Sequence, residues 1–139
     1  MKPWIFALFI LPMAVFGTTI EYAEVAKLKA CEAQLEDTLY RIRALYREDA
    51  DFLPAFEVAQ KQWEKYCAAA LEARFPAKNK QEAYGSVFPV AYAAVKRGLV
   101  EARIAALAVW TTGVEEGDVS KGAVKWKAEI DELRKRKKG

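Results

Sequence analysis

The chain has 139 residues, of which 53% are hydrophobic, and its formal net charge is +3 without a single histidine. This length is enough for one small domain with its own core. The lack of histidine excludes Ser-His-Asp and Cys-His catalytic sites and removes the commonest general base and metal ligand. Because a CxxC pair and a phosphate-binding glycine loop are missing too, we expect a non-enzymatic protein that holds no metal or cofactor.

The N-terminal sequence predicts a cleaved signal peptide over residues 1–17. Lys2 gives a positive start, an apolar run from Trp4 to Phe16 follows, and Gly17 is small enough for a cleavage point. The apolar run is shorter than the roughly 20 residues that a membrane-spanning helix needs, and an uncleaved anchor is the alternative. A signal peptide directs the mature protein to the periplasm or the outside of the cell.

The rest of the chain predicts an all-α fold. A small antiparallel three-helix bundle (residues 18–119) is expected, followed by a short C-terminal helix and a basic tail (residues 120–139). Apolar side chains recur at spacings of three and four along three segments, which is typical of helices with one buried face. The predicted stripes are Leu28, Cys31, Leu35, Leu39, Ile42 and Tyr46; Phe56, Ala59, Trp63, Cys67 and Ala70; and Ala91, Val95, Leu99, Arg103, Leu107 and Trp110.

Capping residues and prolines predict where the helices begin and end. Asp51 is expected to cap the second helix, which ends at Phe75 because the residue before Pro76 is pushed out of helical geometry. Residues 76–85 are predicted to form a loop, and Ser86 is expected to cap the third helix.

The two cysteines predict one disulfide bond between the first two helices. A signal peptide together with a pair of cysteines is typical of a protein from an oxidising compartment. If these helices form an antiparallel hairpin that turns near Ala50, Cys31 lies 19 residues before the turn and Cys67 lies 17 residues after it. At about 1.5 Å of rise per residue, the two cysteines differ in height by only about 3 Å. The alternative is two separate buried thiols.

Three short motifs, AQKQWEKY, YGSVFP and LVEARIAAL, follow one another in the middle of the chain. Their order and spacing resemble the LprI-type family of lysozyme-inhibitor-like secreted proteins, which has a signal peptide and a small helical domain. The motif positions, which we expect to be mainly structural, are Gln60, Trp63, Gly85, Ser86 and Arg103. Two family cysteines that look bonded to each other are replaced here by Leu71 and Val95, and a third by Ser120, so the chain resembles a divergent member.

Arg103 is a charged residue on the predicted apolar stripe of the third helix. A buried guanidinium needs hydrogen-bond partners. Gln60 can offer its side-chain oxygen, Glu57 or Glu64 can neutralise the charge, and Trp63 can pack over the guanidinium plane. We therefore predict that Gln60, Trp63 and Arg103 form a structural pin between the second and third helices, with a ligand-binding role as the alternative.

The resemblance implies a secreted binding protein that inhibits lysozyme. Animal lysozymes are strongly basic, so an inhibitor is expected to offer carboxylates to their cleft. Glu115, Glu116 and Asp118, on a turn after the third helix, are the candidate binding residues. Tyr84, in the loop before Ser86, is a candidate aromatic anchor, and packing at the start of the third helix is its alternative role.

The alternative function is that of a structural or interaction module of the cell envelope with an unknown partner, because a helical bundle does not specify function. The basic run from Arg134 to Lys138 either contacts anionic lipid or envelope polymer or is only a solvated end. Nucleic acid is not an expected partner, since the rest of the chain is mildly acidic and the secreted location disfavours it.

Overall fold

The computed structural model describes residues 14–136 and confirms an all-α fold. Three long helices form the bundle, and a short helix follows each of the second and third. The helices are α1 (Ala14–Leu45), α2 (Phe52–Arg74), α3 (Lys80–Tyr84), α4 (Phe88–Thr112) and α5 (Lys127–Arg136). None of these described helices is long and apolar enough to cross a membrane. Residues 1–13 of the predicted signal peptide lie outside the described part of the chain, and the rest of it begins α1.

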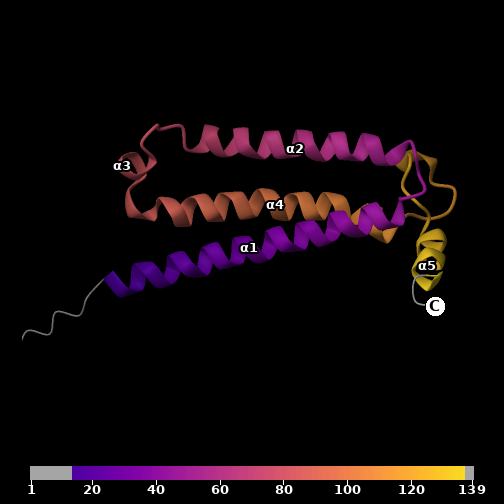
Figure 1. The fold of residues 1–139 in the computed structure, drawn as a ribbon, viewed down its shortest axis with the longest axis horizontal. Coiled ribbons are helices and arrows are strands. Elements are labelled where there is room, and N and C mark those ends of the chain that lie inside the picture. Colours follow the sequence, from indigo (N-terminus) through magenta and orange to yellow (C-terminus); the bar gives the residue numbers. More distant parts are fainter. Residues whose placement is uncertain (1–13, 137–139) are drawn as a thin grey trace, which may run out of the picture.

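The three long helices run alternately up and down the bundle, as Figure 1 shows. α2 returns from the turn after α1, and α4 then runs in the same direction as α1. α4 makes its most extensive contact with α1 and packs against α2 as well. From their shared turn α1 and α2 diverge, so the ends far from this turn are held together mainly through α4 (Figure 1).

The turn between α1 and α2 is capped by Asp49 rather than by the predicted Asp51. Asp49 Oδ1 accepts a hydrogen bond from the Phe52 amide at 2.8 Å, whereas the side chain of Asp51 makes no capping bond. The Asp49 amide is itself bonded to the Tyr46 carbonyl at 2.9 Å. This tight turn brings Asp49 next to the first free amide of α2, which is why the cap lies two residues earlier than expected.

The predicted loop over residues 76–85 contains helix α3. Asn79 begins this helix, because its side-chain oxygen accepts a hydrogen bond from the Glu82 amide at 3.2 Å. Lys80 Nζ donates to the Phe75 carbonyl at the C-terminal end of α2, where a positive charge is favourable. The sequence pattern missed α3 because a helix of five residues is too short to show an apolar period.

Gly85 and Ser86 connect α3 to α4. Gly85 has a φ of +69°, a left-handed conformation that favours a residue without a Cβ atom. Ser86 lies in a single 3₁₀ turn, and α4 begins only at Phe88 with a proline in its first turn. The prediction that Ser86 caps this helix is therefore wrong, whereas the backbone of Gly85 explains the glycine at this motif position.

The stripe predicted for the first helix is correct, since all six of its residues are buried. In α2, Phe56 and Cys67 are buried as predicted, but Ala59 is exposed and its neighbour Gln60 is buried instead. Near the middle of α2, the buried position is therefore one residue later than predicted, at Gln60 instead of Ala59. This places a polar amide inside the bundle, where it needs a hydrogen-bond partner.

The buried face of α4 differs from the predicted one. Its fully buried residues are Ala93, Val100 and Leu107, which recur every seven positions, while Arg103 and most of the predicted stripe are half-buried. α4 contacts α1 on one side and α2 on the other, so its apolar residues spread around a wide arc. A single stripe does not describe a helix with neighbours on two sides.

The segment after α4 docks on the end of the bundle. The Tyr46 hydroxyl accepts a hydrogen bond from the Lys125 amide at 3.0 Å. Val114 bonds through its amide to the Lys125 carbonyl at 3.1 Å and through its carbonyl to the Lys127 amide at 2.9 Å. Ile130 of α5 is fully buried. These contacts join the C-terminal segment to the turn between α1 and α2.

Candidate functional site

The structure brings Gln60, Trp63 and Arg103 together between α2 and α4. Arg103 donates from Nε and Nη2 to Gln60 Oε1, at 3.1 and 3.0 Å. The guanidinium carbon lies 5.7 Å from the centre of the Trp63 ring, within cation–π range. Gln60 is only 3% exposed, so its amide is committed to contacts inside the protein. The buried amide and the ring together hold one guanidinium between two helices.

Within residues 14–136, neither Glu57 nor Glu64 pairs with Arg103 as the sequence suggested. Glu57 binds Arg43 instead, at 2.6 and 3.0 Å, and Glu64 Oε1 accepts a hydrogen bond from Gln60 Nε2 at 3.3 Å. Burial lowers the pKa of Arg103, because the guanidinium loses part of its hydration. The side chain remains charged at neutral pH. Gln60 is thus the group that compensates for its desolvation.

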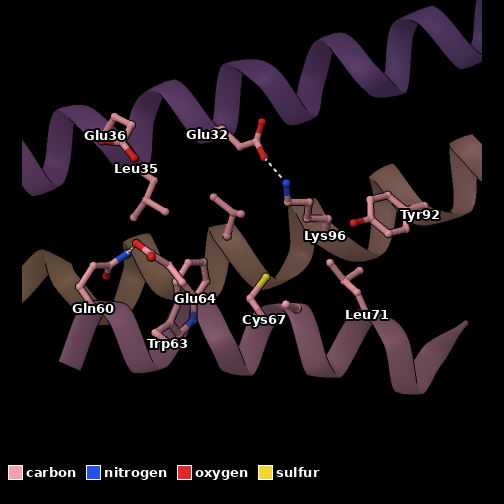
Figure 2. Close-up of a pocket in the computed structure, with 12 residues that line it drawn as sticks. Glu32, Leu35, Glu36, Gln60, Trp63, Glu64, Cys67, Leu71, Tyr92 and Lys96 are labelled. Carbon is pink, nitrogen blue, oxygen red and sulfur yellow. Dashed lines mark hydrogen bonds and ion pairs between the residues drawn. The ribbon is translucent and has the colours of Figure 1, made fainter. Parts of the chain in front are cut away.

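A groove of about 400 Å³ lies beside this cluster, between α1, α2 and α4 (Figure 2). It opens where α1 and α2 diverge. We name it the central groove. It is lined by Glu32, Leu35, Glu36, Gln60, Trp63, Glu64, Cys67, Ala68, Leu71, Tyr92, Lys96 and Val100.

The central groove is acidic at one end and apolar at the other. Figure 2 shows Glu36 of α1 and Glu64 of α2 toward one end and Leu71 toward the other. Lys96 of α4 lies between them and binds Glu32 of α1 at 2.6 Å. This hydrogen bond raises the pKa of Lys96, so the lysine stays charged and its ion pair is neutral overall. The remaining two carboxylates give the groove a net negative charge.

Neither carboxylate was predicted to be a binding residue, and Glu64 was considered only as a partner of Arg103. Glu36 directly follows Leu35 of the predicted stripe, and Glu64 directly follows Trp63. Acidic residues in such positions are common at the edge of any amphipathic helix, and only the divergence of α1 and α2 turns them into the rim of a groove. Within residues 14–136, no group of three His, Cys, Asp or Glu side chains is placed to hold a metal ion.

The predicted Cys31–Cys67 disulfide bond is wrong, because both cysteines are free buried thiols in the structure. The prediction assumed that α1 and α2 pack together along their whole length. They diverge instead, so Cys67 lies on the wall of the central groove while Cys31 belongs to the core cluster with Val100 of α4. Similar height along the two helices does not bring the sulfur atoms together.

We expect both thiols to react slowly in the native protein. Burial raises the pKa of Cys31 and of Cys67, so little thiolate is present at neutral pH. Iodoacetamide should label two cysteines in denaturant and fewer than two in native buffer, as read by intact mass. An unreduced protein that is two protons lighter than the reduced one, and that takes no label when unfolded, would instead show that the two cysteines form a disulfide bond.

Two of the three predicted acidic binding residues have partners in the C-terminal segment that follows α4. Glu115 forms an ion pair with Lys127, and Asp118 Oδ1 accepts a hydrogen bond from the Ser120 hydroxyl at 2.5 Å. Glu116 is exposed. These residues, 115–118, form a turn between α4 and α5, which we name the acidic loop. Its carboxylates are accessible at one end of the molecule.

Tyr84 packs against the start of α4. Its ring lies 5.5 Å from that of Phe75 and 5.8 Å from that of Phe88, and its hydroxyl accepts a hydrogen bond from the Ala77 amide at 3.3 Å. These contacts match the packing role that was the alternative to an anchor. α3 and α5 lie at opposite ends of the bundle in Figure 1, so Tyr84 and the acidic loop do not form one surface.

A family model described as lysozyme inhibitor LprI matches residues 17–107. This match covers well over half of the chain. The protein belongs to the LprI lysozyme-inhibitor family. No curated protein and no solved structure matches it. The region matched by the LprI model includes every residue of the central groove and the Gln60–Trp63–Arg103 cluster, and it ends before the acidic loop.

Proposed function

We propose that this LprI family member is a secreted or periplasmic, non-enzymatic binding protein that inhibits lysozyme. The observation that carries the proposal is the match of residues 17–107 to the lysozyme inhibitor LprI family. The signal-peptide pattern at the N-terminus supports the location. An inhibitor acts by binding, so it needs a complementary surface and no catalytic group.

Charge complementarity supports a basic lysozyme as the partner. The acidic loop presents Glu115, Glu116 and Asp118 at one end of the bundle. Glu115 pairs with Lys127 and Asp118 accepts a hydrogen bond from Ser120, so the local negative charge is confined to residues 115–118. Exposed rim charges chiefly accelerate the encounter of two proteins and contribute less to the closed interface. We therefore assign to the acidic loop a role in attracting the partner, while Tyr84 serves packing within the protein.

The test is inhibition of a basic animal lysozyme by the purified mature protein across a salt series. We expect inhibition at micromolar protein or below, weaker at high salt because exposed charges are screened. A variant with Glu115→Gln, Glu116→Gln and Asp118→Asn should associate several-fold more slowly at low salt and dissociate at the wild-type rate. Surface plasmon resonance separates these two rates.

Absence of inhibition and of binding at micromolar protein would contradict the proposal. The protein would then be assigned to the alternative, an envelope module with another partner. A melting curve of the same sample serves as the control, because an inactive but folded protein is informative and an unfolded one is not.

A further inference from the structure

We propose that the central groove binds the partner protein, and that an arginine or lysine side chain of that partner occupies it. The identity of the partner as lysozyme rests on the proposed function, but the chemistry of the occupant rests on the groove itself. Four features of the groove carry the inference: its apolar floor, its two rim carboxylates, the guanidinium-binding cluster beside it and its position within the region matched by the family model.

The floor of the groove suits the alkyl stem of a long basic side chain. Leu35, Leu71 and Val100 line it and are buried beneath its surface. Trp63 adds a half-buried ring. Arginine and lysine side chains place their methylene groups on apolar surface of this kind while their charged ends reach polar groups.

The acidic end of the groove suits the charged end of that side chain. Glu36 and Glu64 rise from opposite walls, α1 and α2 (Figure 2). Within residues 14–136, neither takes part in an ion pair: Lys96, the one cation of the lining, is bound by Glu32, and the nearby Arg43 is bound by Glu57. Both carboxylates therefore face the groove without an ion pair in the described part of the chain, and Arg43 attracts each of them only at longer range.

Gln60 fixes one of these carboxylates. Its Oε1 is occupied by Arg103, and its Nε2 donates to Glu64 Oε1 at 3.3 Å. Because Gln60 is buried and held by the guanidinium, it can orient Glu64 before any partner arrives. The internal contact of Arg103 with Gln60 and Trp63 also shows that these side chains accommodate a guanidinium on one of their faces.

The shape of the charge distribution favours a basic side chain over other ligands. An anion would face the excess of carboxylates. A metal ion needs several ligands around one point, and the described carboxylates are too dispersed for this. A guanidinium presents five N–H donors in a flat fork and can contact carboxylates on separate helices. The groove is also part of the region matched by the LprI model, whereas the acidic loop lies outside it.

The first test compares two double variants of equal charge change in binding to a basic animal lysozyme. Glu36→Gln with Glu64→Gln should raise the Kd by roughly tenfold or more, mainly through faster dissociation. Asp131→Asn with Glu132→Gln is the matched control. It removes two exposed carboxylates of α5, whose ion pairs within residues 14–136 are with Arg134 and Lys135 of the same helix, and it should leave Kd nearly unchanged. Equal Kd values for both variants would contradict the proposed role of the central groove. Lysozyme binding by another surface would still be supported.

The second test does not depend on lysozyme. The ¹⁵N-labelled protein is titrated with acetyl-Gly-Arg-Gly-amide, and acetyl-Gly-Glu-Gly-amide serves as the control peptide. Amide shifts should change around residues 32–36 and 60–71 with the arginine peptide alone, and these changes should be lost in the Glu36→Gln, Glu64→Gln variant. If the wild-type protein does not bind lysozyme, the proposed function is contradicted. The amide shift changes with the peptides then still test whether the central groove binds a basic side chain. Shifts that are absent, or confined to the acidic loop, would contradict the proposed role of the groove.

Discussion

Replacing Gly113 with alanine is expected to lower the free energy of unfolding by about 3 kcal/mol, through a left-handed backbone and a steric clash together. Gly113 ends α4 with a φ of +76°. A Cβ atom there would lie 2.9 Å from the Lys125 carbonyl oxygen and 3.0 Å from the Lys127 amide nitrogen. Both are backbone atoms of the bridge to Val114, so they cannot move aside without breaking it.

The loss of stability in Gly113→Ala should be accompanied by release of the C-terminal segment from the bundle. Ile130 Cδ1 also lies 3.0 Å from the added Cβ atom, so α5 should lose its buried contact and become sensitive to trypsin. Gly98→Ala is the matched control, because Gly98 lies within α4 and nothing is within 4 Å of its added Cβ atom. That change should stabilise the protein by up to about 1 kcal/mol through helix propensity.

Chemical denaturation of the three proteins measures both effects. Opposite signs for the two glycine substitutions would support the close approach at Gly113. Wild-type stability and protease resistance in Gly113→Ala would show that the C-terminal segment does not dock as described.

Replacing Arg103 with alanine is expected to cost about 2–3 kcal/mol of stability. The change removes both hydrogen bonds to Gln60 Oε1 and leaves a buried acceptor unpaired. It also removes the guanidinium from the Trp63 ring. Gln60 cannot turn to solvent, because it is enclosed by the bundle at 3% exposure.

Two further variants separate this role from a general effect of charge or size. Arg41→Ala removes an exposed arginine whose ion pair with Asp37 lies at the surface, and it should cost less than about 1 kcal/mol. Gln60→Leu combined with Arg103→Met should recover most of the stability lost in Arg103→Ala, since no polar group is then left unpaired. A melting temperature of Arg103→Ala equal to wild type would defeat the structural pin and favour a ligand-binding role.

The contact between Arg103 and Gln60 could be predicted from the sequence because a charge on an apolar stripe requires a partner. Glu57 and Glu64 were equally reasonable partners on paper, since both lie within one turn of Gln60 on the same helix. Glu57 is recruited by Arg43 across the turn between α1 and α2 instead. That competition depends on which side chains the turn places opposite each other, so no spacing rule could reveal it.

The central groove could not be predicted from the sequence. Its walls belong to α1 and α2, whose apolar stripes predict that they share a core but not the angle between them. The same angle keeps the two cysteines apart. The rise of about 1.5 Å per residue predicts their relative height along the helices, whereas their lateral separation depends on how α4 packs against both helices.

By itself, the sequence determined the helical class, the three long helices, the buried stripe of α1 and the resemblance to the LprI family. These properties depend on periodicity, capping residues and short motifs, which are local along the chain. Only the tertiary structure decided that α1 and α2 diverge, that Cys31 and Cys67 remain free, that α5 docks through Gly113 and Ile130, and that carboxylates from two helices face one groove. Each of these depends on angles and contacts between distant segments, which side-chain packing sets and local sequence does not encode.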